Sequence, residues 1–162
     1  MQKSKGKYKE MYQKVENFLK RHGYSILDRK RITVNREELG QKFIEPDVVG
    51  CKDNEVWIFE CKQPCTIEQF GFALGQLACY KWIFDQKTEL LEKRIGKEVK
   101  NVKYSIALLA TSKYPLKNGL LKTFKEILNH YRFEFFGLLK IEERNGEYSE
   151  PEELLKSFSY RI

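Results

Sequence analysis

The stretch 44-IEPDVVGCKDNEVWIFECKQ-63 combines two hydrophobic strand patterns with charges that a buried sheet should exclude. Asp47, Glu60 and Lys62 flank or interrupt runs such as VWIF, which are typical of strands in the interior of a sheet. An unpaired charge there costs several kcal/mol of folding free energy, or else its pKa shifts until the group is neutral. We therefore expect these three charges to be compensated by one another or by a bound ion.

A hairpin within this stretch would bring the three charges together. Asp53-Asn54 suits a two-residue turn, because both residue types tolerate the positive φ values that such turns require. With this turn, Asp47 lies directly opposite Glu60, so that both side chains share one face of the sheet. Lys62 points to the same face, because side chains alternate along a strand. The sequence thus predicts a cluster of two carboxylates and one amine.

This combination of groups indicates a particular chemistry. Two carboxylates close together raise the pKa of at least one of them unless a cation is present. Hard oxygen ligands suit Mg²⁺ or Mn²⁺, and Mg²⁺ commonly keeps several waters and completes its shell with substrate phosphate. A neighbouring lysine can orient the attacking water and stabilise negative charge that develops on the phosphorus. The pattern predicts metal-dependent hydrolysis of phosphodiester bonds.

Pro46-Asp47 followed by Glu60-Cys61-Lys62, between two predicted helices, resembles the motif of the PD-(D/E)XK nuclease superfamily. This superfamily includes restriction endonucleases, RecB-type nucleases and archaeal Holliday-junction resolvases. The resemblance covers roughly residues 8–112 and implies an α/β (α+β) fold: a restriction-endonuclease-like mixed sheet flanked by helices, with core order αβββαβ and a C-terminal helix and strand in addition.

The resemblance also implies roles for the motif residues. Asp47 and Glu60 would bind Mg²⁺, which Mn²⁺ could replace, the backbone carbonyl of Cys61 would be a further metal ligand, and Lys62 would be the catalytic lysine. The cysteine departs from the usual form of the motif, in which an apolar residue is commoner, although a cysteine packs acceptably there.

Two helices carry further candidates. Gln76 and Tyr80, in 75-GQLACY-80, lie four residues apart and hence on one helix face. They resemble the QxxxY motif of RecB-type nucleases, whose residues support the active site and DNA, although Tyr80 could instead be a core aromatic residue. Many members of the superfamily carry a metal-supporting glutamate on the first helix. Glu10 and Glu16 both flank its apolar stripe, and we favour Glu16, which lies nearer the end of that helix.

Periodicity and turn residues predict the order of elements along the chain. Thr66 and Gln69 have the spacing of a capping box, which indicates a helix start at Ile67. The predicted elements are helix 8–22, strands 24–28, 31–35, 43–50 and 55–62, helix 67–85, a solvated helix end and loop 87–103, strand 102–111, helix 118–131, strand 132–143 and a short helix after Pro151.

Composition bounds the class of protein. The 162 residues are the size of one domain, spanning 1–162, and the formal charge of +7 favours a polyanionic partner. No apolar run is long enough to cross a bilayer, and the basic N-terminus lacks the apolar core of a signal peptide, so we expect a cytoplasmic protein that does not enter membranes. The four cysteines lack metal-site spacing, and we interpret them as reduced core thiols.

These observations lead to one function and one alternative. We expect a Mg²⁺-dependent deoxyribonuclease, an endonuclease rather than an exonuclease, whose natural partner is DNA. One such site cuts one strand, so cleavage of a duplex favours a homodimer. The alternative is a catalytically inactive nucleic-acid-binding or accessory module with the same fold.

Overall fold

The computed structural model describes residues 2–28 and 30–156, and their side chains from residue 8 onward. The helices are α1 (Gln2–Arg21), α2 (Arg36–Leu39), α3 (Ile67–Gln86), α4 (Glu89–Ile95) and α5 (Asn118–His130). The strands are β1 (Ser25–Ile26), β2 (Ile32–Thr33), β3 (Phe43–Ile44), β4 (Val48–Lys52), β5 (Glu55–Lys62), β6 (Asn101–Ala110), β7 (Phe136–Arg144), β8 (Glu147–Tyr148) and β9 (Glu152–Leu155).

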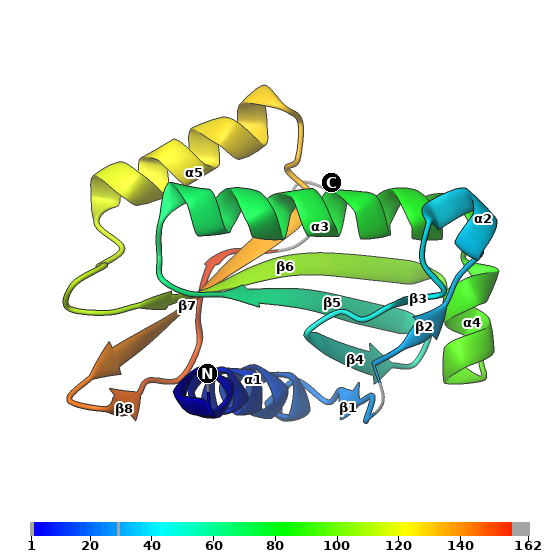
Figure 1. Cartoon of the computed structure of the whole chain (residues 1–162), viewed down its shortest axis with the longest axis horizontal. Helices are drawn as coiled ribbons and strands as arrows, with labels where there is room; N and C mark the ends of the chain where they lie inside the picture. The colour runs from blue at the N-terminus through cyan, green and yellow to red at the C-terminus, as the bar shows by residue number, and fades with distance from the viewer. Residues whose placement is uncertain (1, 29, 157–162) are drawn as a thin grey trace.

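One mixed sheet organises the chain. Its strands follow the spatial order β1-β4-β5-β6-β7-β8, and β9 also pairs with β7. The pairs β5–β6 and β6–β7 are parallel, whereas β4–β5 is antiparallel. Parallel neighbours need crossover connections, which α3 and α5 provide. Figure 1 shows α3 and α5 above the sheet and α1 below it, so the predicted mixed sheet with helices on both faces is confirmed.

Alternation along β5 divides the core into two layers. Val56 and Ile58 belong to the cluster that packs against α3 and α5, whereas Trp57 and Phe59 pack against α1. The same alternation turns Glu60 toward the α3 side. Strand β5 therefore has α3 on one face and α1 on the other.

Helix α1 packs closely against β4 because Gly50 carries no side chain. A Cβ atom at Gly50 would lie 3.0 Å from a methyl group of Leu19, which is tighter than most real contacts. Met11, Val15 and Leu19 are fully buried on this face. This close packing brings the neighbouring residue Tyr12 toward the start of β4.

Two local predictions are confirmed. Val48 pairs with Phe59, which is the register expected from a turn at Asp53-Asn54, and Asp53 has φ +51°. The side chain of Thr66 accepts a hydrogen bond from the backbone N–H of Gln69 at 3.3 Å, and α3 begins at Ile67 as expected.

The predicted C-terminal helix is wrong. Glu152–Leu155 forms β9, which is antiparallel to β7, and Glu152 makes a salt bridge of 3.1 Å with Lys140. The edge of β7 that faces away from β6 offers backbone hydrogen bonds, and these outweigh the helix propensity of EELL. Residues 157–162 of the predicted helix lie outside the described part of the chain.

Other differences concern boundaries and small elements. The segment 87–103 contains α4, which covers the core through the fully buried Leu91, and is thus more than a solvated loop. Strands β2 and β3 form a separate two-stranded sheet with the short helix α2 between them. The first helix begins at Gln2, and β7 begins only at Phe136. Within the described residues, no helix has the length and apolar character needed to cross a bilayer.

Candidate active site

Asp47 is held at the point where β4 begins. Continuing the observed β4–β5 register by one residue places Asp47 opposite Glu60. Its Oδ2 accepts a hydrogen bond of 2.7 Å from the backbone N–H of Cys61, and its Oδ1 accepts one of 3.0 Å from the hydroxyl of Tyr12. The carboxylate thus serves as the acceptor for a backbone group of β5 and is oriented from two sides.

A lysine that the sequence pattern did not single out approaches the same strand end. The Nζ of Lys30 donates a hydrogen bond to the backbone carbonyl of Asp47 and lies 4.7 Å from the centroid of the Tyr12 ring. Tyr12 could have been noticed, because it borders the apolar stripe of the first helix. Lys30 is one of 30 basic residues and carried no comparable signal.

Glu60 is a buried carboxylate whose negative charge is only weakly offset by its surroundings. The residue is 1% exposed, and neither carboxylate oxygen makes a hydrogen bond of normal geometry among the described residues, although the side chains of Asp47 and Tyr80 interact with it. Burial, followed by the negative charge of Asp47, raises the pKa of Glu60 to about 9, and the charge of Lys62 opposes this shift. A buried acid in this state needs either a proton or a cation.

Lys62 lies two residues beyond Glu60 on the same face of β5. Its side chain is half-buried, and within the described chain it makes no hydrogen bond or ion pair. Its positive charge nevertheless lowers the pKa values of Glu60 and of the Cys61 thiol, although burial keeps the pKa of Cys61 well above its usual value. Lys62 therefore offers an uncommitted amine beside the carboxylates.

Helix α3 brings Tyr80 to the carboxylates. Tyr80 is 9% exposed, and burial, followed by the charges of Glu60 and Asp47, raises the pKa of its hydroxyl. Gln76 precedes Tyr80 by one helical turn on the same side of α3 and is exposed. The pair thus runs from the buried acids to the surface.

Helix α1 presents Tyr12 to the site, and Glu16 lies one turn further along the same side of the helix. Glu16 is half-buried, and no hydrogen bond or ion pair joins it to either acid within the described residues. Glu10 is exposed, and its negative charge raises the pKa of Tyr148 in β8. Of the two glutamates considered from the sequence, Glu16 is thus the one that lies on the Tyr12 side.

The residues present fit a hard divalent cation. Glu60 supplies two buried oxygens without hydrogen bonds of normal geometry among the described residues, and each oxygen of Asp47 retains a lone pair beyond its single hydrogen bond. The N–H and C=O groups of one strand residue point to the same edge, so the Cys61 carbonyl faces the Asp47 side. In the described part of the chain no three Asp, Glu, His or Cys side chains gather into a metal cluster, and Mg²⁺, which keeps several waters, tolerates so few protein ligands.

The cysteines do not form such a cluster. All four are free; Cys51, Cys61 and Cys65 are buried as predicted, whereas Cys79 is exposed, which corrects the expectation of a core thiol. Its position on the outer side of α3 explains the difference.

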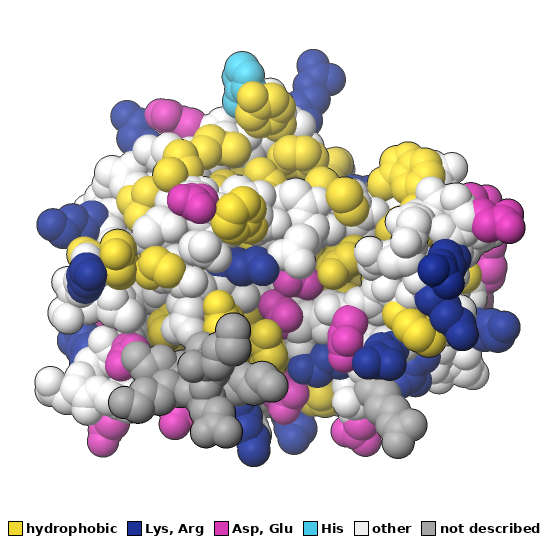
Figure 2. Space-filling view, viewed as in Figure 1, with side chains coloured by type: hydrophobic (Ala, Val, Ile, Leu, Met, Phe, Trp, Pro, Cys, Tyr) yellow, Lys and Arg dark blue, Asp and Glu magenta, His cyan; other side chains and the backbone are white. Residues whose placement is uncertain are grey.

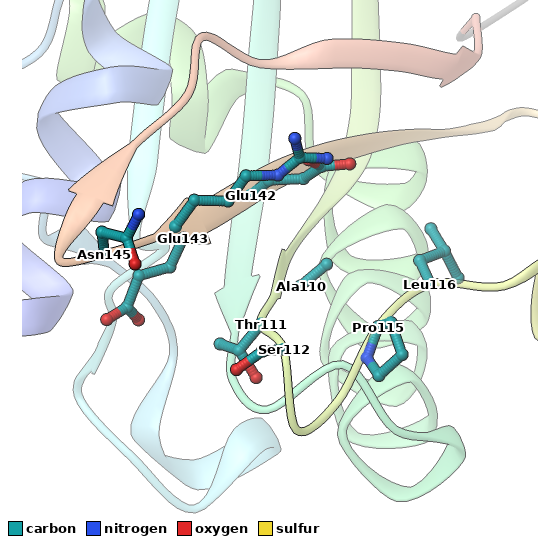
Figure 3. A pocket seen from close by; sticks show the side chains of 9 residues that line it. Ala110, Thr111, Ser112, Pro115, Leu116, Glu142, Glu143 and Asn145 are labelled. Carbon is teal, nitrogen blue, oxygen red and sulfur yellow. The ribbon is translucent and has the colours of Figure 1, made fainter.

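A pocket of about 470 Å³ lies at the C-terminal ends of β6 and β7. Figure 3 shows Thr111 and Ser112 on one side of it and Glu142, Glu143 and Asn145 on the other. The residues that line this pocket do not include the two acids or Lys62. The pocket lies at the same end of the parallel strands as Glu60 and Lys62, but it is a separate hollow.

Comparison with known proteins adds one structural similarity. No protein-family model matches the chain, and no curated protein matches it. An XisH family protein from Nostoc punctiforme PCC 73102, known from a crystal structure at 1.60 Å resolution, has a TM-score of 0.46 and 16% sequence identity to this chain. The alignment covers 87% of this chain and 97% of that protein.

Proposed function

We propose that this protein is a metal-dependent nuclease that hydrolyses phosphodiester bonds, with DNA as its substrate. The observation that carries the proposal is the carboxylate of Glu60, which is 1% exposed, makes no hydrogen bond of normal geometry among the described residues and lies beside a second acid, Asp47. Retaining a second acid next to a buried acid is costly unless a cation occupies the site. The choice of DNA follows from the resemblance to PD-(D/E)XK nucleases and from the charge of +7.

Mg²⁺, or Mn²⁺ in its place, would be held by Asp47, Glu60 and the backbone carbonyl of Cys61. When bound, the cation would polarise the scissile phosphate and lower the pKa of a bound water. Residues of the protein would position the metal ligands and contact the substrate. The hydrogen bonds from Tyr12 and from the Cys61 N–H fix the carboxylate of Asp47, so that no reorientation is needed when substrate arrives.

Lys62 is suited to act on the substrate directly. Lys62 is half-buried, and its amine can stabilise negative charge on the phosphate or orient the attacking water. Tyr80 packs beside the acids and Gln76 extends the same helix side to the surface, where it can contact the substrate backbone. Glu16 remains a candidate to support the cation through water.

The reaction makes one cut at each site. Cleavage of both strands of a duplex would therefore require two copies of the chain or two successive nicks. We propose an endonuclease acting as a homodimer.

The decisive experiment compares cleavage with binding. Supercoiled plasmid, linear duplex, single strands and a four-way junction are incubated with the protein and with Mg²⁺, Mn²⁺ or chelator. Lys62→Ala should abolish metal-dependent cleavage, whereas Lys125→Ala, which removes an exposed lysine of α5, should leave it unchanged. If the wild-type protein binds DNA in a salt-sensitive way but cuts none of these substrates, the chain is a binding or accessory module instead.

A further inference from the structure

The outer face of α3 is apolar although it is exposed. Residues 69–80, QFGFALGQLACY, contain no charged residue, in a chain of which 33% is charged. On the side that faces away from the sheet, Phe72 is 54% exposed and Trp82 is 60% exposed. A helix that is apolar on its outer face as well as on its inner one is normally buried on both sides. This face therefore suggests a further partner.

Four exposed residues form one line along the helix. Phe72, Gly75, Cys79 and Trp82 recur at spacings of three and four residues, which is the pattern of a helix–helix seam. A Cβ atom at Gly75 would meet no other atom within 4 Å, so the middle of this line is open. We call these four residues the α3 stripe; it has two large residues at its ends and two small ones between them.

We propose that the α3 stripe binds the same stripe of a second copy of this chain, as an antiparallel helix pair about a two-fold axis. In this arrangement Phe72 lies opposite Trp82 of the second copy, and Gly75 lies opposite its Cys79. Large residues then meet at both ends, while the small residues in the centre allow the helices to approach closely. The stripe is thus complementary to itself, as a two-fold interface requires.

The distribution of charge supports a second copy as the partner. Near a two-fold axis each residue lies close to its own counterpart, so a charged residue there would meet a like charge. Three stripe residues, Phe72, Gly75 and Cys79, lie in the uncharged segment between Glu68 and Lys81. Trp82 follows Lys81, whose charge is paired with that of Asp85 at 2.6 Å. Self-association therefore brings no like charges together at its centre.

The surface is small for a stable dimer. Helix α3 has 20 residues, which corresponds to a length of about 30 Å, and a width of roughly 10 Å gives a footprint on the order of 300 Å². A patch of this size lies within the range that monomeric proteins expose and that is often functional, whereas a stable interface buries about 800 Å² per partner. Figure 2 shows hydrophobic side chains over α5 as well as over α3, and Phe135, 37% exposed, lies beside Lys81. We expect a dimer that dissociates in the micromolar range.

Sedimentation equilibrium of the full chain tests the proposal. The average mass should rise with concentration from 19.3 kDa toward twice that value. Gly75→Glu should weaken dimerisation at least tenfold, because it places a charge at the centre of the stripe. Gly119→Glu is the matched control, since Gly119 is an exposed glycine in α5 with nothing within 4 Å of its Cβ position, and it should behave as the wild type.

Cross-linking tests the orientation of the two helices. Gly75→Cys should form a disulfide with Cys79 of the second copy when the thiol oxidant diamide is added, because opposed small residues lie within the roughly 7 Å between Cα atoms that a disulfide allows. The cross-link should disappear when Cys79→Ser is added, and Gly119→Cys should give none. The wild type should not cross-link, because its two Cys79 residues are offset along the axis by about 6 Å.

A protein that stays monomeric at all concentrations would overturn the proposal, as would unchanged dimerisation of Gly75→Glu or cross-linking that persists without Cys79. The inference rests on the homodimer of the proposed function. Because these experiments involve no nucleic acid, their failure would remove the homodimer but leave the nuclease activity to its own cleavage test.

Discussion

The hydroxyl of Tyr12 donates a hydrogen bond of 3.0 Å to Oδ1 of Asp47 and thereby ties α1 to the strand end before β4. The other oxygen of Asp47 is held by the Cys61 N–H at 2.7 Å. Burial and the charge of Asp47 raise the pKa of Tyr12, so its hydroxyl remains a proton donor well above neutral pH. The orientation of this acid therefore depends on how α1 packs against the sheet.

Tyr12→Phe should separate positioning from binding. The variant loses one half-buried hydrogen bond, and we expect the free energy of unfolding to decrease by about 1 kcal/mol. Cleavage should slow about tenfold because Asp47 is less well oriented, whereas DNA affinity should not change. The matched control is Tyr8→Phe, because Tyr8 contacts the Tyr12 ring but has no hydrogen bond to Asp47. Equal cleavage rates for both variants would contradict the role given to Tyr12.

Glu60 should make the metal-free protein less stable as pH rises. Its pKa is raised from 4.5 to about 9, so between these values the folded state binds more protons than the unfolded state. The stability that Glu60 contributes is therefore fully present below about pH 4.5 and is lost progressively as pH rises toward 9. Glu60→Gln should remove this dependence and stabilise the metal-free protein at pH 8 by roughly 1–3 kcal/mol, as denaturant unfolding across this pH range would show.

The control for Glu60 is Glu126→Gln, which alters a carboxylate that is 67% exposed. It should keep the pH dependence of the wild type. Magnesium provides a second comparison, since ligand binding stabilises the folded state. At pH 8 Mg²⁺ should raise the melting temperature of the wild type and of Glu126→Gln but not that of Glu60→Gln. An identical response in all three proteins would place the metal elsewhere.

The hairpin and α3 could be predicted because local sequence determines them. The turn at Asp53-Asn54 sets the register in which Val48 meets Phe59, and Thr66 marks the start of α3. The same register is sufficient to predict that Asp47 and Glu60 face each other across the two strands. The coarse architecture followed from the same elements, because alternation of strands and helices leads to a sheet covered on both faces.

Contacts between distant segments could not be predicted in this way. Lys30 reaches Asp47 from the connection between β1 and β2, whose course depends on the whole sheet. The segment Glu152–Leu155 has good helix formers, yet it pairs with β7 because that strand has a free edge. In both cases a contact between distant segments determines the structure, and the spacing of residues along the sequence does not indicate that contact.

The two lysines at the site should respond differently to truncation. Lys30 donates to the backbone carbonyl of Asp47, so Lys30→Ala should lower the free energy of unfolding by about 1 kcal/mol and slow cleavage only partly. Lys62 makes no such contact among the described residues, so Lys62→Ala should change stability by less than about 0.5 kcal/mol and yet reduce cleavage at least 100-fold. Urea unfolding measures the change in stability, and single-turnover cleavage measures the change in rate. If Lys30→Ala caused the larger loss of cleavage and Lys62→Ala the larger loss of stability, the roles given to the two lysines would have to be exchanged.

The thiols should differ in reactivity as their burial does. Cys79 is exposed, whereas burial raises the pKa of Cys65 to about 11 and keeps that of Cys61 well above its usual value. Because the thiolate is the reactive form, a thiol reagent at pH 8 should modify one cysteine quickly in the native protein and all four after unfolding. Cys79→Ser should abolish the fast reaction. A second fast thiol at Cys61 would mean that β5 opens at the candidate site, and the fixed orientation of Asp47 could not then be maintained.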